Sequence, residues 1–333
     1  MIIGDGRSRP SNRGCSMLDA LKFVQGAIQK NGITPDLEHY IIKDGRVTGF
    51  NGYMALSAPL PLDIEAMPKA DLFHKAIKAC GEKVSLTLTE AGRLHIRSGP
   101  FSAFVPCIER VVYEAQPEGE SFAVPEGLAA AFATMLPFIS DDASRPWAMG
   151  LSMANGCYTA TNNVILLQQW TGHALPPINC PRFAVAEVAR VGVDPVEMRF
   201  ADGALSFIYE DGRWLRTQLL THEWPTETMS RILDKPSEQE PVKPELFEAV
   251  RQLVPFLEER FGAVHFEDFQ ITTHPQGAEA GAAIAFEGLP AGLAFRAKAL
   301  EMLEGIMTTI DWDTAPCLFF GQNMRGALIG MQY

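Results

Sequence analysis

The chain has 333 residues, which is longer than a single hydrophobic core usually reaches, so we expect two or three domains. Its apolar content of 47% and charged content of 20% are typical of a globular protein, and we expect neither a membrane span nor a signal peptide, because no apolar run is long enough. The net charge of −12 excludes a protein that holds DNA by its overall charge, so any nucleic-acid role must depend on local patches or on topology.

The polar residues 1–15, with glycine, proline and three arginines, predict a flexible tail. The six cysteines are scattered and form no Cys-x-x-Cys pair, which favours free thiols in a reducing cytoplasm over a disulfide or a zinc site. Cys80 and Cys157 fall at helix and strand positions that suit small buried side chains. We therefore expect a cytoplasmic protein.

One order of elements is repeated three times: a helix, a hairpin, a second helix and a second hairpin. Apolar residues at a helical period predict pairs of helices over residues 16–30 and 69–80, 125–139 and 181–191, and 243–257 and 293–306. The copies agree in this order rather than letter by letter, so the repeat is an inference from periodicity.

Six stretches alternate apolar and polar residues about short turns: residues 36–60, 84–108, 147–170, 196–220, 264–289 and 307–333. Asp-Gly and Asn-Gly pairs, such as Asp44-Gly45, Asn155-Gly156 and Asp202-Gly203, are strong hairpin signals. The turns are too short for crossovers, so we expect antiparallel strands throughout.

Two polar stretches rich in proline and glutamate, residues 114–120 and 234–244, separate the copies as linkers do. The predicted organisation is a tail over residues 1–15 followed by three α+β domains over 16–118, 119–234 and 235–333. In each domain, two helices are expected to pack on antiparallel sheets and to cover one face, leaving the other face open.

The sequence contains no phosphate-binding loop, dinucleotide-binding glycine pattern, zinc-protease helix or nucleophile elbow. Asp311 and Asp313 could bind a metal, but their alternation with Ile310 and Trp312 favours outward strand positions. The seven histidines show no paired ligand spacing. We therefore predict no catalytic residue, no metal, no cofactor and no enzymatic activity.

Basic residues recur on the predicted helices of this acidic chain. In residues 69–80, Phe73 and Ile77 share one face, whereas His74, Lys75 and Lys78 share the other. Each such charge alone is typical of a solvated surface, but together they form a recurring feature of the helices.

Three stretches carry a resemblance. Residues 144–167 run from an Arg-Pro start through a hairpin to Ala160-Thr161-Asn162-Asn163, residues 215–233 contain Trp224-Pro225 after a strand, and the chain ends in Leu-Ile-Gly-Met-Gln-Tyr. With the threefold repeat, they resemble the bacterial-type DNA polymerase III beta sliding clamp over residues 16–333. That family has Ala-Thr-Asp-Gly, Phe-Pro and a tail like Met-Pro-Met-Arg-Leu in these places.

The resemblance implies α+β sliding-clamp domains and a role in DNA replication. Two copies would close head to tail into a ring around double-stranded DNA, with helices lining the hole, and would tether the polymerase for processivity. The matching ring-contact positions are Phe101, Ala103, Phe104, Phe256 and Leu257. The residues expected to contact phosphates without reading base sequence are Lys22, Lys30, Lys69, Lys75, Lys78, Arg145, Arg182, Arg190 and Lys298.

The resemblance also implies a hydrophobic pocket, between the middle and last domains, for short peptide motifs of the DNA polymerase and the clamp loader. By position it would be built from Ala148, Thr161, Asn163, Ile165, Leu166, Pro225, Ile232, Ile329, Met331 and Tyr333. Departures from the family pattern, such as Gly330 in place of the tail's proline, would be explained by a divergent, phage-type member with its own partners.

Two alternatives stay open. One is a clamp-like structural or decoy protein that does not encircle DNA, and the other is a cytosolic enzyme with an unrecognised site between the repeats. A native mass near twice 36.5 kDa, with retention on nicked circular but not linear DNA, would distinguish a clamp from both.

Overall fold

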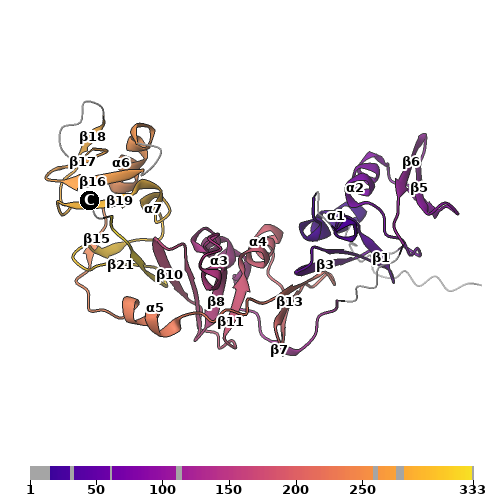
Figure 1. The fold of residues 1–333 in the computed structure, drawn as a ribbon, viewed down its shortest axis with the longest axis horizontal. Helices are drawn as coiled ribbons and strands as arrows, with labels where there is room; N and C mark the ends of the chain where they lie inside the picture. Colours follow the sequence, from indigo (N-terminus) through magenta and orange to yellow (C-terminus); the bar gives the residue numbers. More distant parts are fainter. Residues whose placement is uncertain are drawn as a thin grey trace, which may run out of the picture. The chain divides into compact units, whose positions relative to one another are not determined.

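The computed structural model describes residues 16–30, 34–60, 62–109, 115–257, 262–274 and 281–331. The chain divides into two compact units, the first comprising residues 1–124 and 193–218 and the second residues 125–192 and 219–333. Figure 1 labels their helices and strands. The tail predicted for residues 1–15 lies outside the described residues.

The first unit is built on a seven-stranded antiparallel sheet and a separate three-stranded sheet. The larger sheet has the order β1 (Ile41–Lys43), β2 (Arg46–Phe50), β3 (Met54–Pro59), β14 (Trp214–Gln218), β13 (Ala204–Ile208), β12 (Glu197–Ala201) and β7 (Glu120–Phe122). The smaller sheet has the order β4 (Ser85–Leu88), β5 (Arg93–Ser98) and β6 (Phe101–Pro106). Since β3 pairs with β14, strands far apart in the sequence share one sheet.

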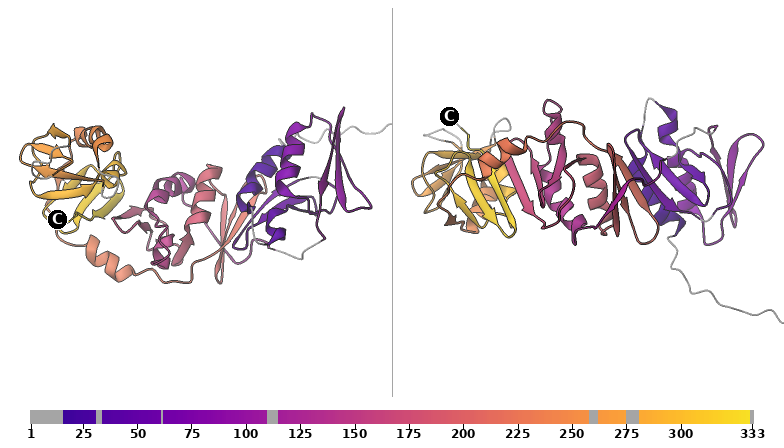
Figure 2. Two further views of the ribbon diagram at one scale, coloured as in Figure 1. Left: turned by 45° about the horizontal axis from the view of Figure 1, so that its top comes forward. Right: turned by 90° about the horizontal axis from the view of Figure 1, so that it is seen from below.

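Helices α1 (Met17–Val24) and α2 (Ala70–Ala79) lie beside one another in the first unit (Figure 2). The Ser16 hydroxyl caps α1 by accepting the backbone N–H of Asp19 at 3.2 Å. The helix then buries Leu21 and Val24 against β2 and β3. It approaches so closely that a Cβ on Gly49 would lie 2.6 Å from the carbonyl oxygen of Val24, so glycine is needed there.

The second unit contains an eight-stranded sheet in the order β11 (Ile178–Pro181), β8 (Gly150–Ala154), β9 (Cys157–Thr161), β10 (Ile165–Trp170), β22 (Met324–Leu328), β21 (Cys317–Gly321), β20 (Thr309–Asp311) and β15 (Glu240–Pro241). A four-stranded sheet has the order β18 (Ala283–Ala285), β17 (Gln270–Thr272), β16 (Ala263–Glu267) and β19 (Leu293–Arg296). Both sheets are antiparallel.

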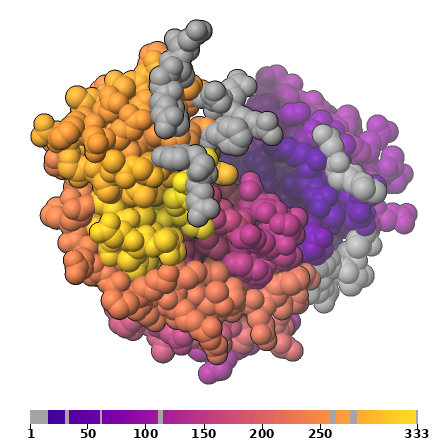
Figure 3. Space-filling model, turned by 60° about the vertical axis from the view of Figure 1, so that its left-hand side comes forward, coloured from indigo at the N-terminus to yellow at the C-terminus, as the bar shows by residue number. Residues whose placement is uncertain are grey.

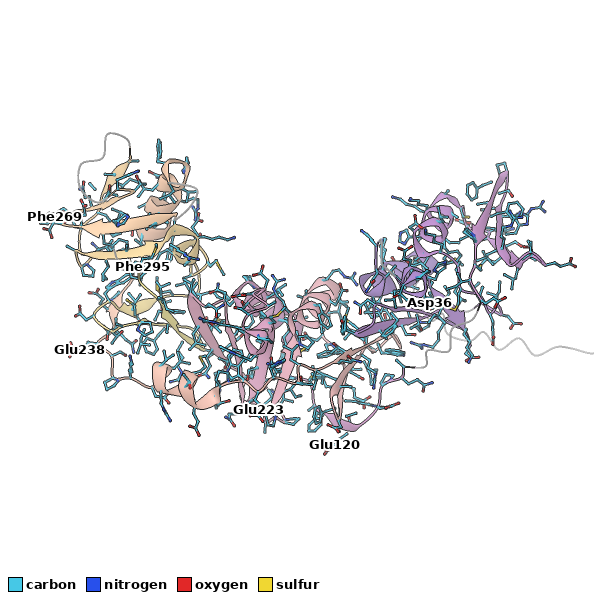
Figure 4. All side chains as sticks on the ribbon, in the orientation of Figure 1. Asp36, Glu120, Glu223, Glu238, Phe269 and Phe295 are labelled. Atoms are coloured by element: carbon cyan, nitrogen blue, oxygen red, sulfur yellow. The ribbon has the colours of Figure 1, made fainter. Side chains whose placement is uncertain are left out.

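Five helices cover these sheets: α3 (Leu128–Met135), α4 (Arg182–Val191), α5 (Thr226–Leu233), α6 (Glu245–Leu253) and α7 (Ala297–Glu301). Helices α3 and α4 pack side by side on one face of the larger sheet, where Phe132 meets Tyr158 edge to face, and α5 lies against the opposite face (Figure 1). Around the smaller sheet, Phe295 lies within the core, whereas Phe269 lies at the surface (Figure 4).

The structure confirms the α+β class with helices packed on antiparallel sheets, and all six predicted hairpin stretches contain antiparallel strand pairs. Among the described cysteines, all are free thiols, as expected. The expected burial was wrong in detail, because Cys180 and Cys317 are the buried thiols, whereas Cys80 and Cys157 are half-buried. The division into three domains stays a prediction.

Three local predictions were wrong. The predicted helix over residues 293–306 is helical only over α7, because Leu293–Arg296 pairs with β16 instead. Helix α5 was not predicted at all. Asp311 does not face outward: its carboxylate is buried and accepts the backbone N–H groups of Glu238, Asp313 and Thr314 at 2.8, 3.0 and 3.2 Å.

Candidate functional site

A small cavity lies between α5 and the eight-stranded sheet. It has a volume of about 150 Å³, and we call it the apolar cavity. Alternation along the strands turns Leu166 of β10 and Ala327 of β22 toward α5, and these residues form a buried cluster with Leu233 and Leu318. Figure 3 shows the yellow C-terminal strands meeting the coral surface of the segment that carries α5.

The turn between β9 and β10 forms one end of the apolar cavity. The side-chain oxygen of Asn162 accepts the backbone N–H groups of Val164 and Ile165 at 3.1 and 2.8 Å, which fixes the turn. Asn163 adopts a φ of 70°, a left-handed conformation that asparagine tolerates, and its side-chain oxygen accepts a hydrogen bond from Arg145 at 2.8 Å. The predicted tail residue Ile329 donates its backbone N–H to the carbonyl of Val164 at 2.9 Å.

Several residues that the sequence predicted for a partner pocket line this cavity together: Thr161, Asn163, Ile165, Leu166, Ile232 and Ile329. Four others do not: Ala148 is fully buried, Pro225 and Met331 are not in the lining, and Tyr333 lies outside the described residues. Further lining residues were missed: Trp147, Val164, Met229, Pro316 and Ala327. Arg145, which was predicted to contact DNA, also lines the cavity.

The missed residue Met229 had a detectable signal in its spacing from Ile232, which was predicted. They are three positions apart on α5, so they share one helical face, and Leu233 next to Ile232 is buried in the same cluster. The segment was overlooked because it was interpreted only as a turn after Trp224-Pro225. Trp224 packs edge to face against Trp147, with ring centroids 5.3 Å apart, and this contact joins the start of α5 to the sheet.

The predicted DNA-contacting residues are mostly exposed side chains on helices. In the first unit, Lys75 lies 3.4 Å from Asp71, and Lys22 lies 3.7 Å from Asp19. Lys78 is exposed and has no ion-pair partner among the described residues. Lys30 is exposed, and Lys69 is half-buried and lies 3.5 Å from Glu38.

The second unit carries the remaining basic candidates on its own helices. Arg190 pairs with Glu187 at 2.6 Å, and Arg182 donates its Nε–H to the carbonyl of Ile139 at 3.3 Å. Lys298 of α7 is exposed. A basic residue beside a carboxylate, such as Arg190, contributes less net positive charge to the surface than a lysine without such a neighbour, such as Lys78.

His74 was not predicted as a site residue, although it lies on the same helix as Lys75 and Lys78. Burial, together with the charges of Lys78 and Lys22, lowers the pKa of His74 below its ordinary value. Its Nδ1 is buried and has no hydrogen-bond partner among the described residues. Burial first, and the neighbouring positive charges second, therefore favour the neutral imidazole.

The predicted ring-contact residues are at the surface of the two units. Phe104 is 56% exposed on β6, an edge strand of the three-stranded sheet, and it stacks on His95 with ring centroids 4.3 Å apart. Phe101 and Ala103 on the same strand are half-buried. In the second unit, Phe256 is 57% exposed and Leu257 is half-buried just after α6. Both aromatic side chains are accessible to a second molecule.

Within the described part of the chain, no group of three or more His, Cys, Asp or Glu side chains is arranged to hold a metal ion. A membrane-crossing helix is likewise absent from the described residues, since none is both long and apolar enough.

Comparison with known proteins found no matching family model and no matching curated protein. Solved structures do match. The DNA polymerase sliding clamp from Bacillus subtilis has a TM-score of 0.80 at 14% identity, covering 95% of this chain and 97% of that one. A putative DNA polymerase III beta subunit from Eubacterium rectale has a TM-score of 0.81 at 9% identity, with the same coverage.

The sliding clamp from Pseudomonas aeruginosa, solved bound to griselimycin, has a TM-score of 0.77 at 15% identity and covers 96% of this chain and 97% of that one. A TM-score near 0.8 over nearly the whole of both chains, at such low identity, is a likeness of fold rather than of sequence. The chain has the fold of the bacterial DNA polymerase III beta sliding clamps.

Proposed function

We propose that this protein is a DNA sliding clamp in which two copies close head to tail into a ring around duplex DNA and tether the replicative polymerase. The observation that carries the proposal is the likeness of fold to sliding clamps. It covers about 96% of this chain and 97% or more of those clamps. Under this proposal the chain has three clamp domains, over residues 16–118, 119–234 and 235–333, and acts in the cytoplasm as a binding protein rather than an enzyme.

The ring contact would use the exposed apolar residues of the two units. Phe104 presents an aromatic ring on a free strand edge, and Phe256 presents another beyond α6. A head-to-tail contact joins two different surfaces, and it gives a ring when the rotation closes. The apolar side chains support this contact because water leaves them when the copies meet.

DNA would be held by topology and by weak phosphate contacts. The basic side chains are spread singly over several helices, a distribution that suits phosphate contacts, which carry no sequence information. An acidic net charge of −12 would keep DNA away from other surfaces while basic helices attract it locally.

The apolar cavity would bind short peptide motifs of the polymerase and the clamp loader. It joins aliphatic walls from α5 and β10 to the exposed Ile329, which is 51% exposed despite its apolar side chain. Met229 supplies an adaptable wall for ligands of different shape. Two similar clamps were solved with griselimycin bound, so this compound is a practical probe for binding by the present protein.

The proposal is tested by native mass spectrometry, by retention on DNA circles and by electron microscopy. A clamp gives a mass near twice 36.5 kDa, a ring in class averages, and retention on nicked circular DNA that is lost when the circle is cut. A monomer at micromolar concentration, or equal retention on linear and circular DNA, would contradict it. A dimer that is never retained would instead indicate a clamp-like structural or decoy protein.

A further inference from the structure

A second cavity, of about 210 Å³, lies beneath the same helix, and we call it the polar cavity. It is lined by Trp224, Thr226, Met229 and Ser230 from the start and middle of α5, and by residues of β8, β9, β10 and β22. The apolar cavity also has Met229 in its lining, so the two cavities adjoin at this side chain.

The two cavities lie along one face of the sheet, because strand alternation turns every second residue toward α5. Residues of β8, β9 and β10 that face α5 include Ser152, Thr159 and Gln168 at one end of the sheet, and Thr161 and Leu166 at the other. The face beneath α5 is therefore polar at one end and apolar at the other. A sheet face whose only task were to support a helix would be expected to be apolar throughout.

Three hydroxyl groups that line the polar cavity have a proton available to donate. Ser152 is 6% exposed, and its hydroxyl has no hydrogen-bond partner among the described residues; the Ser230 hydroxyl likewise has none. The Thr159 hydroxyl oxygen accepts the side-chain N–H of Gln168 at 3.2 Å, which leaves its own proton to donate. Neither serine oxygen is among the buried polar atoms without a partner, so both hydroxyls are open to an acceptor that enters from outside.

Among the described residues that line the polar cavity, Arg325 is the one with a charged side chain. Its Nε–H donates to the side-chain oxygen of Gln168 at 2.8 Å, and its Nη1 donates to Asp234 at 2.8 Å and to the carbonyl of Leu233 at 3.4 Å. Asp234 is not in the lining, and its side chain is 60% exposed, so water screens it more than it screens a group inside the cavity.

We propose that the polar cavity is a specificity subsite for a carboxylate, which an aspartate or glutamate of the partner peptide inserts while its apolar anchor occupies the apolar cavity. The subsite rests on the proposed partner pocket and adds the chemical class of a second recognised side chain. Ser152, Ser230 and Thr159 supply neutral donors, and Arg325 supplies the positive charge.

The experiment uses fluorescent hexapeptides with two adjacent apolar residues and, at each remaining position in turn, Asp, Glu, Gln, Lys or Ala. Binding to the full-length protein is measured by anisotropy. We expect one spacing at which Asp or Glu binds about tenfold tighter than Ala, with Gln intermediate and Lys weakest, because a charge-assisted hydrogen bond exceeds a neutral one. The advantage should fall in high salt.

Two variants connect that advantage to the cavity. Ser152→Ala combined with Ser230→Ala removes donors without disturbing Arg325, and it should reduce the advantage of the acidic peptide while leaving the Ala peptide unchanged. Asp234→Asn removes the competing carboxylate, and it should increase the advantage. Replacing Arg325 alone is less informative, because its contacts to Leu233 and Asp234 also hold the end of α5.

Cys157, which lines the polar cavity, gives a readout independent of affinity. An acidic peptide should protect Cys157 from iodoacetamide, as mapped by mass spectrometry, while Cys107 of the first unit reacts at an unchanged rate. If apolar peptides bind but no acidic position improves binding or protects Cys157, the subsite is wrong and the partner pocket stands. If no peptide and no griselimycin binds, the partner pocket and the subsite both fall.

Discussion

Replacing Lys78 and Lys75 with glutamine should weaken DNA binding and flatten its salt dependence. Both lysines are exposed on α2, but they are not equivalent, because Lys75 lies 3.4 Å from Asp71 and Lys78 has no carboxylate partner among the described residues. Each phosphate contact contributes about 0.9 to the slope of log K against log salt concentration, so two full contacts contribute about 1.8. At 0.1 M salt that is a loss of about 60-fold in affinity.

The two single variants should account for unequal parts of the change in salt slope. Lys78→Gln should lower the slope by about 0.9, and Lys75→Gln by less, because Asp71 already offsets part of the charge of Lys75. The assay is anisotropy with a labelled duplex between 50 and 200 mM salt, repeated with a second duplex of unrelated sequence. The two duplexes should lose affinity equally, since phosphates carry no sequence information.

A matched control removes two positive charges elsewhere. Lys83 is exposed outside the helices, and Arg231 is 79% exposed on α5 beside Glu227. Lys83→Gln with Arg231→Gln changes the net charge by the same amount, so it should shift the slope by much less if α2 carries the contact. An equal shift in both double variants would mean that net charge alone governs binding, and a change in base preference would refute passive encirclement.

The remaining predictions concern the other surfaces and one buried group. Phe104→Glu should yield folded monomers of 36.5 kDa by native mass spectrometry, because an unpaired charge at an apolar contact is costly; a persistent dimer would exclude β6 as the ring contact. If the proposed partner pocket is right, deleting residues 329–333 should abolish the binding of polymerase-derived peptides in calorimetry and leave dimerisation intact, and unchanged affinity would locate the partner site elsewhere. Asp311→Ala should lower the free energy of unfolding in urea by about 2–4 kcal/mol, since three backbone N–H groups lose their acceptor, whereas the exposed Asp313→Ala should change it by about 0.5 kcal/mol or less. The pKa of His74 is lowered in the free protein and nearby phosphate would raise it, so DNA binding should take up a proton. Duplex affinity should therefore rise as the pH falls through the pKa that His74 has in the complex, and a pH profile that His74→Gln leaves unchanged would contradict this.

The local sequence pattern was sufficient to predict most of the helices and strands. Alternation about Asn155-Gly156 predicted the β8–β9 hairpin, and the helical period of residues 69–80 predicted α2, because both depend on neighbours within a few positions in the chain. The open second face of the sheet was expected, but its occupation by α5 was not. That helix is short, begins after Pro225 and is stabilised by burying Leu233 against β10 and β22, and no local rule reports this contact.

The candidate site was predicted in part, through the family resemblance. The resemblance placed Thr161, Asn163 and Leu166 near the β9–β10 turn in the pocket, together with Ile232 and Ile329 from distant segments. Met229 and Pro316 enter the lining from segments far along the chain, and Ala148 sits too deep to reach it. Only the packing of α5 on the sheet decides which side chains meet there.

The amino-acid sequence by itself determined the order of helices and antiparallel hairpins, the acidic balance and the basic residues on the helices, because periodicity and composition are properties of the chain. The tertiary structure decided what long-range contacts control: that β3 pairs with β14, that Leu293–Arg296 is a strand, and that the buried Asp311 accepts three backbone N–H groups. In each case, hydrogen bonds or buried area gained from a distant segment outweigh the local helix and strand propensities. These propensities differ by only about 0.5 kcal/mol per residue.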